Sequence, residues 1–281
     1  MTVRIVTDST SDLPIEQAKA LGIEIVPLTV AFGDDAYLDN IEMDNAAFYQ
    51  KLQGSKELPR TSQPAPARFQ ETFTRLIQEG ATGILSVHLT SQLSGTYQSA
   101  CTARDALPED LRKIPIEIVD STSVSVGMGY PVIKAAEEAQ AGLGLEEIKA
   151  HLVDRLERTR IFAVLDTLEY VRRGGRIGGA TAMLGNVLNI KPIISLKEGV
   201  VIPVERARTR GKAYARVAQI LQELGPIEYL AIAESSEEVG QQLSEALKPV
   251  YSGDIAIWKL GAALGTHTGP GTAAISVVTA K

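Results

Sequence analysis

Short apolar runs and stretches of helical spacing alternate through the first half of the chain. The apolar runs, which predict buried strands, are residues 3–6, 84–89 and 116–119. Helical spacing predicts helices at residues 14–21, beyond 66, at 129–140 and at 145–158. Residues 23–32 are also apolar, but Pro27 interrupts them, which indicates a sheet edge or a bulge. Strands that alternate with helices favour an open parallel sheet.

The second half orders its elements differently. Apolar runs predict strands at residues 161–165, 191–196, 200–206, 229–233, 255–259 and 273–278, and helices are expected up to residue 224 and at 237–247. A hairpin around Glu198-Gly199, followed by strands that helices connect, is typical of a mixed sheet. Because 281 residues exceed the usual size of one core, we predict an α/β protein of two domains. These are a Rossmann-like parallel-sheet N-terminal domain, residues 1–158, and a mixed α+β C-terminal domain, residues 159–281.

Turns rich in hydroxyl groups follow several of the predicted strands. They comprise residues 8–11, Thr61 with Ser62, residues 91–96 and residues 120–123. The carboxyl ends of the strands of an open parallel sheet face one crevice, so turns that are distant in sequence can converge there. The sequence therefore predicts one polar site at this crevice.

The turn at residues 91–96 is suited to holding an anion. Ser94 stands at the expected helix cap, Gly95 lets the backbone approach closely, and Thr96 adds a second hydroxyl beside the unpaired amides of the first turn. Capping of the helix by Ser94, with no ligand, is the alternative interpretation. The same alternative applies to Ser62, which precedes another predicted helix.

Composition and charge exclude several classes of function. The net charge is −6 and no basic stripe carries interleaved aromatic residues, so a nucleic acid is not an expected partner. No apolar run reaches the roughly 20 residues that cross a bilayer, so stable insertion into a membrane is not expected. The N-terminal residues turn polar too soon for a signal peptide and Cys101 is the only cysteine, which points to the cytoplasm.

Two further stretches predict neither a metal nor a nucleotide. Residues 34–45 are acidic and irregular, but they lack the glycine and the terminal glutamate of a calcium loop, so we interpret them as a solvated face. Residues 174–179 are rich in glycine but match neither a Walker A loop nor a dinucleotide-binding turn. We therefore expect no metal and no cofactor.

A few individual side chains are weighed for a role in the polar site. His267 lies in a polar turn bounded by glycine and proline and is a candidate contact, whereas His88 and His151 fall in apolar patterns typical of structural histidines. Arg176 and Arg208 are weaker candidates to neutralise a carboxylate or a phosphate, since arginine is mostly solvated. Candidates for the wall of an apolar tunnel are Met183, Leu184, Val187 and Leu188, although ordinary core packing is the commoner role for each of them.

Seven short motifs occur in order over nearly the whole chain. They are DSTSDL at residues 8–13, TSQP at 61–64, SGT at 94–96, DS at 120–121, residues 170–177 with GGRI at their end, KPI at 191–193, and His267 with GPG at 269–271. Together these motifs resemble the DegV family of bacterial fatty-acid-binding proteins. The resemblance implies a two-domain protein that buries a long-chain fatty acid such as palmitate, stearate or oleate.

The resemblance also implies residue roles. The acyl carboxylate would be held by Thr61 and Ser94, with secondary contacts from Ser62, Gly95, Thr96 and His267. Hydroxyls and helix amides suit a buried carboxylate, because they satisfy its oxygens without a second charge in the core. At ~0.8 kcal/mol per buried methylene, a chain of ~15 methylenes could gain on the order of 12 kcal/mol before ordering costs.

The function implied is non-catalytic: the protein would carry the fatty acid in lipid transport or metabolism and present it to a fatty acid kinase. One alternative is a serine-dependent acyl hydrolase or transferase that uses Ser94, His267 and a carboxylate such as Asp8 or Asp120. The absence of a G-x-S-x-G elbow speaks against it. A general binder of anions or sugar phosphates is the other alternative, which an extended apolar tunnel would exclude.

Overall fold

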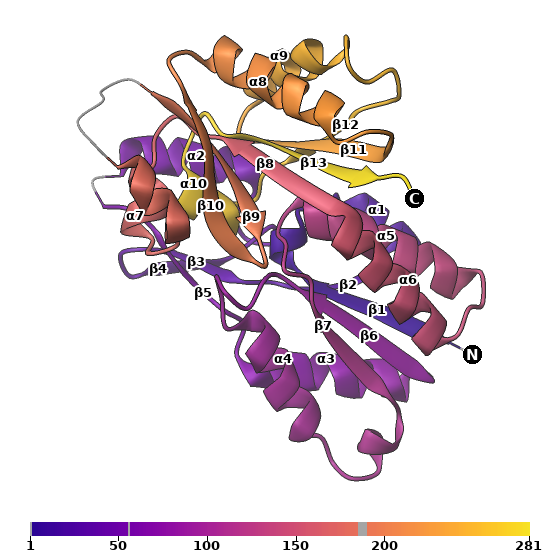
Figure 1. Ribbon diagram of the computed structural model, residues 1–281. Coiled ribbons are helices and arrows are strands. Elements are labelled where there is room, and N and C mark those ends of the chain that lie inside the picture. The colour runs from indigo at the N-terminus through magenta and orange to yellow at the C-terminus, as the bar shows by residue number, and fades with distance from the viewer. Residues whose placement is uncertain (1, 56, 185–189) are drawn as a thin grey trace.

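The computed structural model describes residues 2–55, 57–184 and 190–281. Its strands form three sheets, of four, six and three strands, and Figure 1 shows the two larger ones with helices between and outside them. The predicted α/β fold with a Rossmann-like parallel sheet and a separate mixed sheet is confirmed.

The four-stranded sheet is parallel throughout and has the order β2-β1-β6-β7. Its strands are β1 (Val3–Asp8), β2 (Glu24–Val26), β6 (Gly83–His88) and β7 (Ile116–Asp120). Both faces are apolar because helices cover both: α1 (Ile15–Leu21), α5 (Val126–Gln140) and α6 (Leu145–Arg158) on one, and α3 (Pro66–Gln78) and α4 (Thr96–Asp105) on the other. Parallel strands need such double cover, which explains the continuous apolar runs.

The six-stranded sheet has the order β10-β9-β8-β13-β11-β12, and all its pairs are antiparallel except β11 with β12. The strands are β8 (Thr159–Val164), β9 (Lys191–Lys197), β10 (Val200–Ala207), β11 (Ile227–Glu234), β12 (Ala256–Lys259) and β13 (Ala273–Thr279). Helices α8 (Arg210–Glu223) and α9 (Glu237–Leu247) pack on its outer face. Its inner face looks toward the parallel sheet, with α5 and α6 packed between the two (Figure 1).

The apolar run at residues 23–32 does not form one strand. Pro27 separates β2 from β3 (Thr29–Phe32), and these strands belong to different sheets. Proline has no amide hydrogen for a ladder, so the chain leaves the parallel sheet at this point. β3 is the middle strand of the small antiparallel sheet, between β4 (Asp35–Leu38) and β5 (Arg60–Ser62).

Two predicted irregular stretches are regular in the structure. Residues 34–45 contain β4, and Asp44 caps helix α2 (Asn45–Gly54) through a hydrogen bond from the amide of Ala47. The polar turn around His267 is the last turn of helix α10 (Ala262–Thr268). Short helical pieces complete the fold: η1 (Ser9–Ser11), η2 (Leu111–Lys113), α7 (Glu169–Arg173) and η3 (Gly178–Met183).

The division into domains follows the sheets. Every strand of the parallel sheet precedes α5, and every strand of the six-stranded sheet follows α6. We therefore propose the boundary at residues 158 and 159, where α6 ends and β8 begins. Helix α10 crosses this division, since it packs against α2 and β3 of the first half. Within the part of the chain that the structure describes, no helix is both long and apolar enough to cross a bilayer.

Candidate functional site

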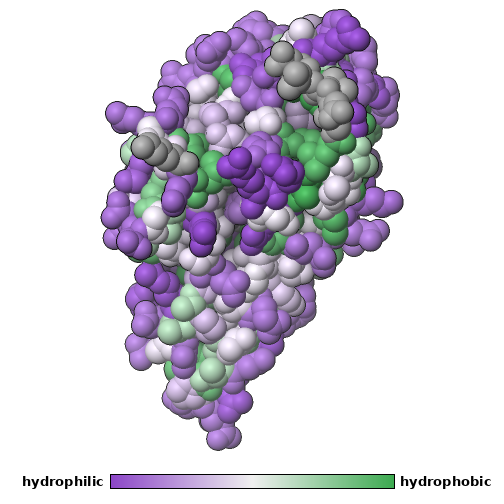
Figure 2. Space-filling view, turned by 90° about the vertical axis from the view of Figure 1, so that its left-hand side faces the viewer, coloured by the Kyte–Doolittle hydropathy of each residue, from purple (hydrophilic) through white to green (hydrophobic). Residues whose placement is uncertain are grey.

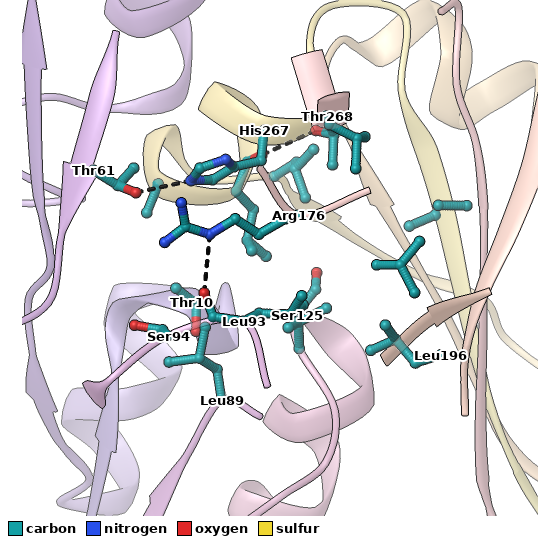
Figure 3. A pocket seen from close by; sticks show the side chains of 18 of the residues that line it. Thr10, Thr61, Leu89, Leu93, Ser94, Ser125, Arg176, Leu196, His267 and Thr268 are labelled. Carbon is teal, nitrogen blue, oxygen red and sulfur yellow. Dashed lines mark hydrogen bonds between the residues drawn. The ribbon is translucent and has the colours of Figure 1, made fainter. Parts of the chain in front are cut away.

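An apolar cavity lies between the carboxyl edge of the parallel sheet and the inner face of the six-stranded sheet (Figure 3). Its volume is about 390 Å³, within the range of sites for small molecules. The loops that follow β1 and β6 contribute Thr10, Leu89 and Ser94. These two strands lie where the strand order reverses, which is where open α/β sheets bind ligands.

The strand pattern of the six-stranded sheet forms much of the cavity wall. Side chains alternate across a strand, so Ile161 and Ala163 of β8 face the cavity while Phe162 and Val164 pack under α8 and α9. Ala163 pairs directly with Ala274 of β13, which also lines the cavity. Two small side chains opposite each other leave room for a ligand along this wall.

Polar side chains gather at one end of the cavity (Figure 3). His267 Nε2 lies 2.8 Å from Thr61 Oγ1, in a hydrogen bond between α10 and β5. Ser94 Oγ lies 2.9 Å from Thr96 Oγ1 and accepts a longer hydrogen bond, 3.3 Å, from the Thr96 amide. The guanidinium of Arg176 lies between these groups, where its Nε donates to the carbonyl of Leu93 at 3.0 Å.

The imidazole of His267 is held in its neutral form. Burial lowers its pKa to about 4, and the positive charge of Arg176 contributes to this shift. The ring packs against Gly174, where a Cβ atom would lie only 2.2 Å from His267 Nδ1. Gly174 therefore has to be glycine for the ring to stay beside Thr61, although its φ of −70° suits any residue.

Arg176 supplies the charge at this end of the cavity. Its Nη1 donates to the carbonyl of Gly174 at 2.7 Å, and within the described ranges no carboxylate forms an ion pair with it. The sequence predicted a cradle of neutral hydroxyls and amides with Arg176 as a weaker candidate, and the structure places this guanidinium in the cavity. A cation with no carboxylate partner beside hydroxyl groups is an arrangement that accepts an anion through charge-assisted hydrogen bonds.

The structure brings most of the predicted site residues together. Thr61, Ser62, Ser94 and His267 all line the cavity. Gly95 and Thr96 do not line it: Gly95 packs on the side chain of Gln63, and Thr96 is fully buried beneath Ser94. Of the two candidate arginines, Arg176 lines the cavity and Arg208 is exposed elsewhere.

The two candidates for the tunnel wall that the structure describes do not line the cavity, and Met183 has the alternative role of core packing. Met183 is buried in a neighbouring cluster with Ala180 and Val201, and Leu184 is 43% exposed. Val187 and Leu188 lie outside the described residues. The wall comes instead from strand positions that face away from α8 and α9, such as Ile161 and Ala163, while the residues between them pack under these helices. Because residues 161–165 are all apolar, the sequence does not show which of them face the cavity.

The described residues do not form the hydrogen-bonded serine and histidine pair that the hydrolase alternative requires. Ser94 is hydrogen-bonded to Thr96 and His267 to Thr61, and among the described residues no hydrogen bond joins Ser94 to a histidine. His88 is completely buried, with its Nδ1 3.0 Å from Asp8 Oδ2 and its Nε2 2.7 Å from Ser86 Oγ. This histidine therefore links β1 to β6 and is a structural residue.

A second, polar cavity of about 780 Å³ adjoins the polar end of the first. The two share Thr61, Arg176 and His267, so this outer cavity reaches the same groups from the other side. Its walls carry the charged side chains Asp34, Glu57, Arg60 and Arg173. Figure 2 shows the face of the molecule on the side of α7, where apolar surface lies on both sides of a group of polar side chains.

The acidic stretch has a structural role in addition to a solvated face. Asp34 and Asp35 are exposed as predicted, but Asp39 is only 1% exposed, and its Oδ1 accepts a hydrogen bond from the amide of Ala262 at 2.9 Å. Over the described part of the chain, no group of three or more histidine, cysteine or acidic side chains could hold a metal ion.

Comparisons with known proteins agree with this geometry. The family model described as "Uncharacterised protein, DegV family" matches residues 2–280. A DegV domain-containing protein of Halalkalibacterium halodurans is 36% identical over 98% of this chain and 97% of its own. The structure is similar to that of a fatty acid binding DegV family protein from Thermus thermophilus, with 34% identity, full coverage of both chains and a TM-score of 0.89. It is also similar to a stearic acid-binding protein from Eubacterium ventriosum, with 26% identity, coverage of 99% and 98%, and a TM-score of 0.91.

Proposed function

This chain belongs to the DegV family, and from that premise we propose that it binds a long-chain fatty acid and carries it without converting it. The observation that carries the proposal is the form of the site: an apolar cavity that ends in Thr61, Ser94, His267 and Arg176. Palmitate, stearate and oleate have the matching form, a long apolar chain with a single anionic end. The solved relatives described as binding a fatty acid or stearic acid support the same ligand class.

In the proposed complex the carboxylate lies among the polar groups. The hydroxyls of Thr61 and Ser94 donate hydrogen bonds to its oxygens, and Arg176 balances its charge. Neutral His267 fixes the position of the Thr61 hydroxyl through their 2.8 Å contact. A buried carboxylate needs several such partners, since it would otherwise be costly to remove from water.

The apolar wall binds the chain of the fatty acid. Each methylene removed from water contributes ~0.8 kcal/mol, so the chain supplies most of the affinity and the polar end sets the orientation. A sugar phosphate would leave this wall facing polar hydroxyls. We therefore favour the fatty acid over the general anion binder.

We further propose that the protein presents the carboxylate to a separate fatty acid kinase in the cytoplasm, as part of lipid transport or fatty acid metabolism. The outer polar cavity supports this step, because it reaches Thr61, Arg176 and His267 from the side opposite the acyl wall. Its arginines, Arg60 and Arg173, suit the approach of a phosphoryl donor. The bound carboxylate has no leaving group that a nucleophile could displace. Without a partner, the site therefore supports binding of the fatty acid and not its conversion.

The experiment that tests the binding proposal is native mass spectrometry of the protein purified from a bacterial host. We expect a bound mass that becomes a C14 to C18 fatty acid after denaturing extraction. Protein that carries no fatty acid, and that takes up neither palmitate nor oleate when these are added, would contradict the proposal. Stoichiometric labelling of Ser94 by a fluorophosphonate would contradict its non-catalytic part.

We expect Ser94→Ala and Thr61→Val each to weaken fatty acid binding by about tenfold or more. Each change removes a hydrogen bond to a charged group, which is worth about 1.5 to 3 kcal/mol. Isothermal titration with oleate measures the change, and Ser91→Ala is the matched control, because Ser91 is exposed on the same loop and does not line the cavity. Equal affinity in both variants and the control would place the carboxylate elsewhere.

A further inference from the structure

The helix that carries His267 is too short to hold its own position. Helix α10 has seven residues, and isolated helices of this length are not stable in water. Its last turn presents His267 to Thr61, and it also lines the acyl cavity with Ala263 and Leu264. What fixes the first turn of α10 therefore also fixes the imidazole.

Two buried carboxylates cap this first turn. Asp12 Oδ1 accepts a hydrogen bond from the amide of Gly261 at 2.8 Å, and Asp39 Oδ1 accepts one from the amide of Ala262 at 2.9 Å. The side chains come from different sheets, since Asp12 follows β1 and η1 while Asp39 follows β4. Asp12 and Asp39 are 4% and 1% exposed, so water does not replace them as acceptors.

The helix also has little freedom to move sideways. A Cβ atom on Gly261 would lie 2.9 Å from Asp12 Oδ1 and 3.1 Å from Asn40 Nδ2. One turn further along, a Cβ atom on Gly265 would lie 2.7 Å from the ring of Phe48 in α2. Because Gly261 and Gly265 have no side chain, the helix backbone packs directly against these neighbouring groups. A shift of the helix would therefore produce either a steric clash or a packing gap.

The charges at the capped end support the same role. Burial raises the pKa of Asp12 to about 8 and that of Asp39 to about 6, and the neighbouring carboxylate of Asp8 adds repulsion to both. The other side chains beside them are neutral: the hydroxyls of Ser9, Ser125 and Tyr49 and the amide of Asn40. Burial therefore favours the neutral form of Asp12 more strongly than that of Asp39, and negative charge that remains on either carboxylate lies at the positive end of α10, where the helix dipole stabilises it.

We infer that Asp39 and Asp12 are positioning residues of the carboxylate site: by capping the first turn of α10 they set where His267 meets Thr61. Neither residue touches the ligand; they act through the helix. The consequence for fatty acid affinity rests on the function proposed above, whereas the geometry of His267 can be measured in the protein without ligand.

The affinity test is a double-mutant cycle. We expect Asp39→Ala to lower oleate affinity about tenfold, the size of one lost helix cap, and Asp39→Asn to restore it to within about twofold, because the amide oxygen still accepts from Ala262. In the background of His267→Ala, Asp39→Ala is expected to add less than a twofold effect. An equal loss in both backgrounds would overturn the inference, since the carboxylate would then act on the site by another route.

The second readout needs no fatty acid. The ¹⁵N chemical shifts of the His267 ring report its hydrogen bond to Thr61, and we expect Asp39→Ala to move the Nε2 signal in the direction that Thr61→Val moves it. Gly261→Ala crowds the same carboxylates and is expected to give a smaller shift of the same sign. This variant replaces Asp39→Ala in the experiment if Asp39→Ala does not fold. An unchanged Nε2 signal in a folded variant would overturn the inference. If the ring signals respond but the wild-type protein binds no oleate, the positioning stands and the proposed function fails.

Discussion

Ala163→Phe is expected to lower the affinity for palmitate by about 100-fold or more. Ala163 and its partner Ala274 form the part of the wall with the smallest side chains, and a phenyl ring at this position occupies the space of the acyl chain. Displacing about four methylenes costs ~3 kcal/mol at ~0.8 kcal/mol each, which is a factor of more than 100. Competition binding with a fluorescent fatty acid measures this loss.

A series of saturated fatty acids from C8 to C18 shows whether the loss has the proposed cause. In the wild-type protein affinity should rise with each added methylene, and in Ala163→Phe the rise should stop where the ring blocks the chain. Ala46→Phe, the same change on the exposed side of α2, is the control and should behave as wild type. Parallel slopes for wild type and Ala163→Phe would mean that the chain does not run along β8.

The second large effect concerns stability and pH. Burial disfavours the charged form of Asp12 and raises its pKa in the folded protein from the ordinary value of 3.8 to about 8. The folded protein therefore holds a proton that the unfolded chain releases, and the stability that depends on this proton is fully present below about pH 4 and is lost as the pH rises through 8. Relative to Asp12→Asn, which cannot ionise, wild type is expected to lose about 3 kcal/mol of unfolding free energy between pH 5 and pH 8.

Urea denaturation of both proteins without ligand, at pH 5, 6, 7 and 8, measures this difference. Taking the difference between the two proteins cancels other groups, including His267, whose lowered pKa acts in the opposite direction below pH 6.5. Asp34→Asn, a change at an exposed position, is expected to follow the wild-type profile. A difference between Asp12→Asn and wild type that does not change with pH would show that Asp12 is ionised in the folded protein throughout this range.

Local patterns determined most strands and helices of the two larger sheets, whereas β4, α2 and α10 lie in stretches that were expected to be irregular. Continuous apolar runs predicted β1, β6 and β7, because strands covered on both faces need apolar residues at every position. The spacing of residues 145–158 predicted α6 with the bounds that the structure has. The convergence of the turns after β1 and β6 followed from the geometry of parallel sheets. Thr61 was grouped with these turns and does line the same cavity, but it lies on β5 of the small antiparallel sheet and not at the edge of the parallel sheet.

Tertiary structure alone decided how the far segments meet. His267 was expected in a turn, but it lies in the last turn of α10, a seven-residue helix whose first turn is capped by Asp12 and Asp39 and which packs against α2. Arg176 was only a weak candidate beside Arg208, and its place in the cavity depends on carbonyl groups of Leu93, 83 residues away, and Gly174. Such contacts leave no periodic signal, because they join single positions on separate elements. The acyl wall depends on both levels. Any strand has two faces, so β8 was certain to point alternate side chains in opposite directions. Only the tertiary structure shows that α8 and α9 cover one face of β8 and that the other face borders the cavity.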